Sequence, residues 1–170
     1  MSFQVGDKIV YPNQGVGVVE QISNRNLTGQ AETFYLLKLQ SNGLRVMVPM
    51  TNVTSVGLRR VARSSEVGNV LAYLNNGSCK SPGGDWKGRF KENSEKMRTG
   101  SLLQVAEVFK TLLVISQAKP LSFREKRMLD RAWQLLLDEI AVVRGWAKEQ
   151  AEQQLVKALS KSNLKVQLPS

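Results

Sequence analysis

The sequence of 170 residues contains no histidine and only one cysteine, Cys79. Without histidine, the chain lacks the usual general base near neutral pH and the commonest side-chain metal ligand. A single cysteine excludes an intrachain disulfide framework and a zinc site built from several cysteines. We therefore expect that the protein is not an enzyme and that it uses no cofactor and no metal.

Long apolar runs are missing as well. The longest apolar-rich stretch, residues 102–115, is interrupted by Gln104, Glu107 and Lys110. This stretch is too short and too polar to span a bilayer. The first residues have neither the basic region nor the apolar segment of a signal peptide. These absences predict a soluble protein of the reducing cytoplasm.

What the chain does have is positive charge. It carries 24 Lys+Arg against 14 Asp+Glu, a net charge of +10, and residues 61–170 hold most of this surplus. Such an excess favours a polyanionic partner, either a nucleic acid or an acidic protein surface. One basic cluster falls within residues 119–131 and consists of Lys119, Arg124, Lys126, Arg127 and Arg131.

The first sixty residues have the pattern of short β-strands. Residues 44–49 alternate apolar and other side chains, which is typical of a half-buried strand. Asn42-Gly43 precedes this run and allows positive φ at both positions, a strong hairpin signal. Four or five such strands without a helical period predict a small curled sheet or a Tudor/SH3-like barrel.

Gly15 and Gly17 could suggest a nucleotide-binding loop. Glu20 stands where that motif has its third glycine, and no helix is expected to follow. The two glycines are better explained by a turn and by a bend where two backbones approach closely.

From about Ser64 the period becomes helical, and about five helices are expected up to residue 160. Ser101 with Gln104, and Ser122 with Glu125, are candidate capping boxes, and Gly145 is a candidate helix end. Strands followed by helices predict an α+β chain of two packed units. We expect a β domain over residues 1–60, an all-α domain over 61–160 and a flexible tail over 161–170.

The stretch around Trp86 combines an aromatic ring with cations. Asp85 is a good N-cap, which would place Trp86 on the first helical turn with Lys87, Arg89 and Lys91 just behind it. A large ring among cations suits a nucleic acid, because cations bind phosphates while the ring stacks or wedges between bases. The alternative is that Trp86 belongs to a helical core, as most tryptophans are largely buried.

Three segments carry a family resemblance when they are considered together. They are Val5-Gly6-Asp7 with Val10-Tyr11-Pro12 and Gly15, Trp86 with Arg89-Phe90-Lys91, and Leu121-Ser122 with Glu125-Lys126-Arg127-Met128-Leu129. In this order and spacing, the chain resembles the CarD/CdnL family of bacterial transcription regulators over roughly residues 3–160.

The resemblance implies a division of labour. The β domain would be a Tudor-like module that binds the β subunit of RNA polymerase, as also seen in transcription-repair coupling factor. The helical domain would contact promoter DNA just upstream of the −10 element without reading sequence. There the tryptophan matched by Trp86 would enter the minor groove at the upstream edge of the bubble and stabilise the open complex. We expect the protein to act as a monomer.

The resemblance also assigns individual residues. On the DNA side, family contacts match Trp86, Lys91 and Lys126, with Lys87 beside them. Another family contact, an arginine two residues after the tryptophan, falls on Gly88, and the adjacent Arg89 is the candidate replacement.

On the polymerase side, a family arginine matches Arg25 and a second one falls on Met47. Arg45 lies two residues from Met47, on the same face of a strand, and could supply the missing charge. Met47 itself either packs at the interface or lies in the barrel. Pro49 ends the same alternating run and completes the expected polymerase-binding set.

Other functions remain open at this point. The protein could be a general nucleic-acid-binding module, which would bind DNA tightly without polymerase. It could also be an adaptor that binds only proteins, with Trp86 as an interface anchor. Two carboxylate pairs, Glu92 with Glu95 and Asp138 with Glu139, offer the only enzymatic hint, and we interpret them as helix-surface charges.

Overall fold

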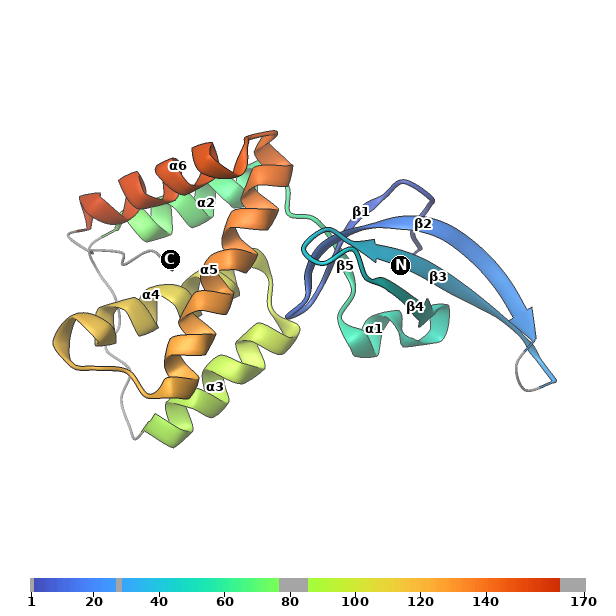
Figure 1. Ribbon diagram of the computed structural model, residues 1–170, viewed down its shortest axis with the longest axis horizontal. Coiled ribbons are helices and arrows are strands. Elements are labelled where there is room, and N and C mark those ends of the chain that lie inside the picture. The colour runs from blue at the N-terminus through green and yellow to red at the C-terminus, as the bar shows by residue number, and fades with distance from the viewer. Residues whose placement is uncertain (1, 27–28, 77–85, 163–170) are drawn as a thin grey trace. The chain divides into compact units, whose positions relative to one another are not determined.

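A computed structural model describes residues 2–26, 29–76 and 86–162. The chain divides into two compact units, Met1–Val61 and Ala62–Ser170. The first contains the strands and the second contains the long helices (Figure 1).

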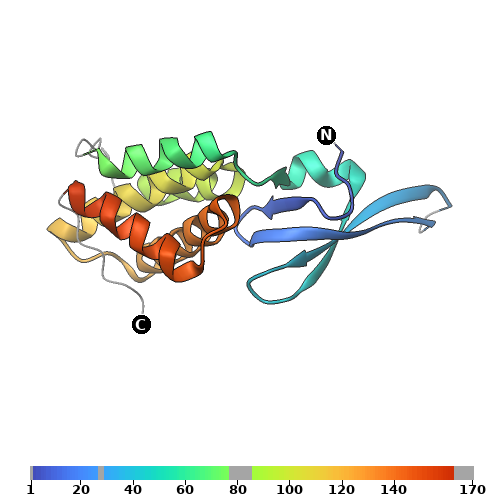
Figure 2. The same cartoon turned by 90° about the horizontal axis from the view of Figure 1, so that it is seen from above.

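The first unit is an antiparallel five-stranded sheet. Its strands are β1 (Lys8–Tyr11), β2 (Gly15–Asn26), β3 (Ala31–Leu39), β4 (Arg45–Pro49) and β5 (Arg59–Arg60), in the order β4-β3-β2-β1-β5. The hairpin of β2 and β3 extends beyond the other strands as a two-stranded ribbon, which Figures 1 and 2 both show.

The sequence predicted a small curled sheet or a Tudor/SH3-like barrel; the five-stranded antiparallel sheet is confirmed, but it does not close into a barrel. Within the described residues, the end strands β4 and β5 do not pair with each other. The chain between them folds instead into a 3-10 turn, η1 (Met50–Asn52), and a short helix, α1 (Val53–Val56), which the sequence analysis did not predict. Val53 of α1 is buried in the same core cluster as Tyr35 and Leu37, so α1 covers part of the core of the sheet.

Two glycine predictions for this unit have different outcomes. A Cβ on Gly17 would lie 2.8 Å from the carbonyl oxygen of Lys38, so the close-approach explanation is confirmed. The hairpin predicted at Asn42-Gly43 is confirmed, since β3 and β4 pair on either side of it, but of the two residues only Gly43 has a positive φ, of 67°. The side chain of Asn42 instead accepts a hydrogen bond from the Leu44 N–H at 3.0 Å, which closes the turn without a second left-handed residue.

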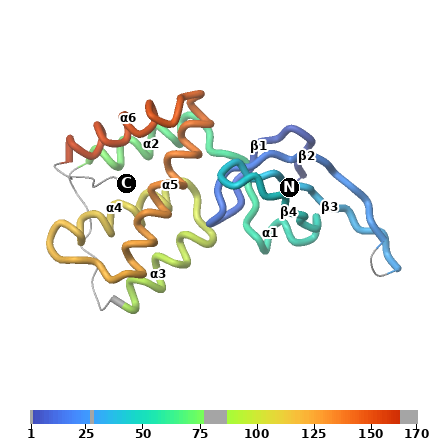
Figure 3. Tube along the Cα trace, in the orientation of Figure 1, coloured from blue at the N-terminus to red at the C-terminus, as the bar shows by residue number. Residues whose placement is uncertain are grey.

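The second unit contains five helices in the described residues. They are α2 (Ser64–Asn75), α3 (Trp86–Thr99), α4 (Leu102–Ala118), α5 (Phe123–Arg144) and α6 (Lys148–Lys161) (Figure 3). The capping box of Ser101 and Gln104 at the start of α4 is confirmed. Gly145 ends α5 with a φ of 67°, as predicted for a left-handed C-cap.

The core of the helical unit lies between α4 and α5, with α2 packed on α4 and α6 packed on α2 and α5. Phe109 of α4 and Trp133 of α5 stack with their ring centroids 5.2 Å apart, and both are buried. Trp133 is therefore a core tryptophan of this unit.

Candidate functional site

Helix α3, which begins at Trp86, has few apolar side chains with which to pack against the rest of its unit. Met97 is the residue of α3 that belongs to the buried core cluster in the described part of the unit. Asn93, on the inner face, is buried although it is polar. Phe90 is half-buried, and polar interactions with the neighbouring helices add to this limited apolar contact.

The first of these interactions joins the start of α3 to the start of α5. The Nε of Arg89 donates to Oε2 of Glu125 at 2.8 Å, and its Nη2 donates to Oε1 at 3.0 Å. The two side chains are only 10% and 3% exposed. The pair is therefore a buried, bidentate salt bridge of the strongest hydrogen-bonding type.

Glu125 is itself held by the N-cap of α5. Its backbone N–H donates to the Oγ of Ser122 at 3.2 Å, as predicted for a capping residue. The prediction of a full capping box here was wrong: the Ser122 side chain caps the Glu125 N–H, but the Glu125 carboxylate accepts two hydrogen bonds from Arg89 in place of one from the N-cap backbone.

A second ion pair attaches the other end of α3. The Nζ of Lys96 lies 3.1 Å from Oε2 of Glu107 on α4 and 3.9 Å from Oε1 of Glu92. Lys96 and Glu107 are about one-third exposed, so solvent screens this contact more than it screens the Arg89–Glu125 pair.

The Arg89–Glu125 pair brings the predicted DNA-binding residues together. It fixes the first turn of α3, with Trp86 and Lys87, beside the first turn of α5, with Lys126 (Figure 1). Lys87, Lys91 and Lys126 are exposed. Both helix N-termini carry partial positive charge, which adds to that of the lysines. Asp85 lies outside the described residues, and so does the placement of the Trp86 side chain.

Arg89 does not fit the role of a replacement DNA contact. Its guanidinium is largely buried and bound to a carboxylate, which leaves little of it for a phosphate. The sequence offered one signal for this pairing: an arginine and a glutamate, each placed within the first turns of a helix.

Phe123 is a surface residue that sequence reasoning missed. It opens α5, is 73% exposed, and has the guanidinium of Arg127 over its ring at 5.8 Å. Arg124 and Lys126 beside it are exposed as well. The available signal was an aromatic residue followed directly by cations at a helix start, the same combination that drew attention to Trp86.

The strand register places all four predicted polymerase-binding residues on one face of the sheet. Met47 pairs with Leu36, which pairs with Gln21, and Arg25 follows Gln21 by four residues on the same face. Arg45 and Pro49 lie two residues on either side of Met47. This outer face is opposite the core side chains Tyr35, Leu37 and Val48.

Exposure on the outer face distinguishes between these residues. Met47 is 36% exposed, so it does not pack in the core of the sheet. Arg45 is 62% exposed and its Nε lies 2.9 Å from Oε2 of Glu20, while Arg25 is exposed near the end of β2. The outer face therefore presents cations around an apolar centre, beside β4, which is an edge strand.

Comparison with known proteins identifies the chain. A family model described as "CarD-like/TRCF RID domain" matches residues 3–62, and a model described as "CarD, C-terminal domain" matches residues 69–156. The chain belongs to the CarD family. Membership in this family supports transcription regulation as the general role of the protein.

Individual relatives agree with CarD-family membership. The chain is 31% identical over 150 residues to a Bacillus subtilis (strain 168) protein named "Putative transcription factor YdeB", covering 87% of this chain and 96% of that protein. Two solved structures from Myxococcus xanthus are also similar. CdnLNt is 49% identical, and the 72-residue N-terminal domain of CarD is 41% identical. The match to CdnLNt covers 36% of this chain and 86% of the CdnLNt chain, with a TM-score of 0.31. The match to the CarD N-terminal domain covers 35% of this chain and 79% of that domain, also with a TM-score of 0.31.

The four carboxylates interpreted as helix-surface charges are not all at the surface. Glu92 pairs with Lys96, and the exposed Glu95 pairs with Arg98. Glu139, however, is only 3% exposed, and its Oε2 accepts a hydrogen bond from the backbone N–H of Ala62 at 2.7 Å. The surface interpretation was wrong for Glu139, which binds the backbone where the helical unit begins.

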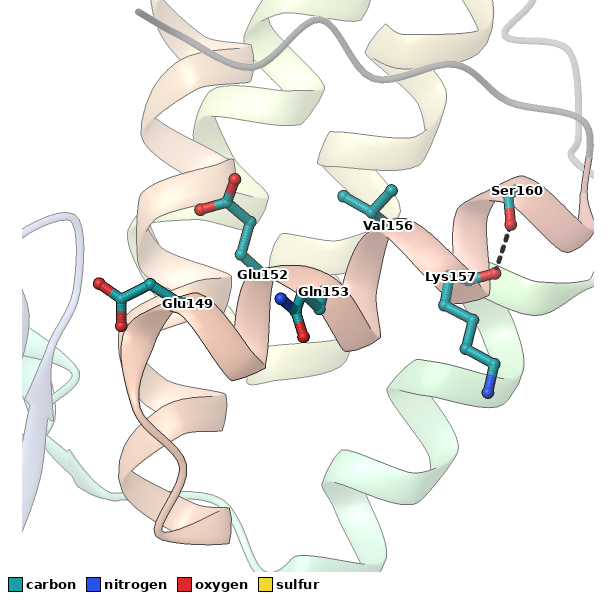
Figure 4. A pocket seen from close by; sticks show the side chains of 6 residues that line it. All are labelled: Glu149, Glu152, Gln153, Val156, Lys157 and Ser160. Atoms are coloured by element: carbon teal, nitrogen blue, oxygen red, sulfur yellow. Dashed lines mark hydrogen bonds between the residues drawn. The ribbon is translucent and has the colours of Figure 1, made fainter.

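A shallow hollow lies on α6. Its lining comprises Glu149, Glu152, Gln153, Val156, Lys157 and Ser160, a single stripe of that helix (Figure 4). Within residues 2–26, 29–76 and 86–162, no helix is long and apolar enough to cross a membrane. In the same ranges, no group of three or more acidic or cysteine side chains is placed to hold a metal ion.

Proposed function

We propose that this CarD-family protein binds the β subunit of RNA polymerase through its sheet and stabilises the promoter open complex through its helical unit. One observation carries the proposal. The exposed lysines Lys87 and Lys91 of α3 and Lys126 of α5 lie within the first two turns of helices whose starts are joined by the Arg89–Glu125 pair. A polyanion is the natural partner of such a surface, and the family makes promoter DNA the candidate.

The polymerase contact would use the outer face and the free edge of the sheet. The edge strand β4 can add to a strand of the partner through backbone hydrogen bonds. Met47 and Pro49 would supply apolar contact, and Arg25 and Arg45 would set orientation and association rate. Transcription-repair coupling factor shares this type of domain in the family model that matches residues 3–62.

The DNA contact would combine a wedge with phosphate binding. The Trp86 ring would enter the minor groove at the upstream edge of the bubble and stabilise unstacked bases. The lysines would hold phosphates and set register without reading base edges. Phe123, exposed beside Lys126, would add apolar contact to the same surface.

Promoter choice would then lie with polymerase. Each contact alone is weak, and binding both partners at once raises the effective concentration of the second contact. The protein would therefore act at many promoters, and free protein would bind duplex DNA weakly.

Trp86→Ala in the full chain tests the proposal. Losing a stack or wedge is worth about 1–3 kcal/mol, so the open-complex lifetime should fall about tenfold to a hundredfold. Polymerase affinity should stay at the wild-type value. Arg25→Glu is the reciprocal variant: it should weaken polymerase binding while leaving the thermal melt of the protein nearly unchanged.

Two outcomes would reject the proposal. If Trp86→Ala prolonged open complexes as well as the wild type, Trp86 would not be a wedge and the protein would act as an adaptor. If the free protein bound DNA tightly without polymerase, it would be a general nucleic-acid-binding module.

A further inference from the structure

We propose that Arg89 and Glu125 form a positioning pair that fixes Trp86 and the lysines of α3 relative to Lys126 of α5, and that Arg89 is not itself a DNA ligand. The inference rests on the proposed function, which it deepens. Its substance is that α3 and α5 present one DNA-binding surface only while their first turns are held together, which this buried salt bridge does in the wild type.

The position of the pair along α3 supports this role. Arg89 lies three residues after Trp86 and two after Lys87, and Glu125 directly precedes Lys126. The salt bridge thus lies within one helical turn of the residues expected to touch DNA, on both helices. The core residue Met97, by contrast, lies three helical turns after Trp86, near the far end of α3.

The geometry of the pair restricts rotation as well as distance. Two parallel hydrogen bonds of 2.8 and 3.0 Å join a planar guanidinium to a planar carboxylate. The Oγ of Ser122, 3.5 Å from Oε1 of Glu125, and its bond from the Glu125 N–H hold the carboxylate side of the pair. The first turn of α3 is therefore fixed against a capped, rigid helix start.

Burial argues against a direct DNA role and against a role in stability alone. The Arg89 side chain is 10% exposed and cannot reach a phosphate without breaking its bond to Glu125. That break would leave the Glu125 carboxylate, which is 3% exposed, buried without its cation. Buried ion pairs also contribute little to stability compared with apolar pairs of the same size. What this pair provides is a defined geometry.

The experiment compares four variants of the full chain with polymerase and a promoter. Arg89→Met removes the guanidinium, and Arg89→Met/Glu125→Met replaces the pair by an apolar contact of similar volume. Arg98→Met is the matched control, because Arg98 also lies on α3 but is 59% exposed and pairs with Glu95 at the surface. Trp86→Ala reports on the proposed function. Open-complex lifetime, the salt slope of promoter association and the thermal melt are measured for each.

If the pair is a positioning device, Arg89→Met should shorten the open-complex lifetime by about tenfold, approaching Trp86→Ala. The double Met variant should melt like the wild type and regain most of the lifetime with a wild-type salt slope. Arg98→Met should behave like the wild type in the lifetime assay.

Three results would overturn the inference. A folded double variant that stays defective, with a salt slope shallower by about one, would make Arg89 a phosphate ligand. A folded double variant that stays defective with an unchanged slope would show that holding the two helix starts together does not sustain the lifetime, so that positioning is not the role of the pair. A folded Arg89→Met variant with a wild-type lifetime would show that the pair positions nothing. If Trp86→Ala were also inert, the proposed function itself would fail, so the two failures are distinguishable.

Discussion

The ammonium group of Lys110, on the buried face of α4, donates a hydrogen bond to the backbone carbonyl of Tyr73 at 2.7 Å. It also donates to the carbonyl of Asn76, and its Nζ lies 4.4 Å from the centroid of the Tyr73 ring. Lys110 is only 1% exposed. A buried cation thus binds two carbonyls at the end of α2, where the helix carries partial negative charge.

Lys110→Met should destabilise the helical unit by about 1–3 kcal/mol, because carbonyls at the end of α2 lose a buried donor. All three tryptophans of the chain lie in this unit, so tryptophan fluorescence during urea unfolding measures its stability alone. Lys157→Met, at an exposed position of α6, is the control and should stay within about 0.5 kcal/mol of the wild type. Equal effects of the two substitutions would contradict a capping role for Lys110.

Gly100 is expected to tolerate no side chain. A Cβ at this position would lie 2.0 Å from the carbonyl oxygen of Lys96 and 3.0 Å from the Cβ of Gln104. Gly100→Ala must therefore shift the junction between α3 and α4, with a loss of about 1–3 kcal/mol in urea unfolding.

Gly68→Ala is the control for Gly100→Ala, because it should change the free energy of unfolding in the opposite direction. Gly68 lies within α2, where the nearest atom to an added Cβ is the Nη2 of Arg144 at 3.7 Å. The substitution should stabilise the helical unit by about 0.5–1 kcal/mol, since alanine is the better helix former. A stable Gly100→Ala variant would show that the junction can relax.

Local signals predicted much of the fold. The capping box at Ser101, the left-handed stop at Gly145 and the close approach at Gly17 each depend on a few neighbouring residues and on steric rules. Such features were predictable because their physical cause lies within one turn or one strand pair.

Long-range polar pairing was not predictable in the same way. Arg89 and Glu125 are 36 positions apart, and Lys110 and Tyr73 are 37 apart. A sequence pattern shows each of these charges as polar, and polar residues are expected at the surface. Only the tertiary fold shows that Arg89 forms a salt bridge with a carboxylate and that Lys110 and Glu139 bind backbone groups in the interior. Helix α1 was also not predictable, because four residues are too few to show a helical period in the sequence.

The half-buried Asp138 of α5 makes part of the stability of the helical unit dependent on pH. Burial raises the pKa of this carboxyl above its ordinary value of 3.8, while Lys148 and Arg131 oppose that shift. The folded state then binds more protons than the unfolded state between 3.8 and the raised pKa. Stability therefore falls as pH rises through this window, and it stays lower above it.

Asp138→Asn should remove the part of the fall in stability with rising pH that is due to this carboxyl. The free energy of unfolding, measured by tryptophan fluorescence at pH 4 and pH 7, should decline less with rising pH in the variant than in the wild type. Other carboxyls titrate in the same range, so the difference between variant and wild type is the quantity to compare. The exposed Asp130→Asn in the same helix should leave the wild-type difference unchanged, and identical behaviour of both variants would contradict the assignment to Asp138.

Salt dependence separates the charged DNA contacts from the apolar ones. Each phosphate neutralised by a lysine releases condensed counterions, so promoter association in the presence of polymerase should weaken as salt rises. Lys91→Ala and Lys126→Ala should each make the log–log salt slope shallower by roughly one, because both side chains are exposed on the surface where α3 and α5 begin. Trp86→Ala should weaken the complex with no change in slope, since a wedge neutralises no phosphate.

The control for these lysines is Lys157→Ala, an exposed lysine on α6 that should leave the slope at its wild-type value. The double variant Lys91→Ala/Lys126→Ala should lose about two units of slope if the two lysines hold different phosphates. Unchanged slopes in both single variants would remove Lys91 and Lys126 from the DNA-binding surface. An equal change in Lys157→Ala would instead show that the slope reports the net charge of the protein, because only a local contact distinguishes one exposed lysine from another.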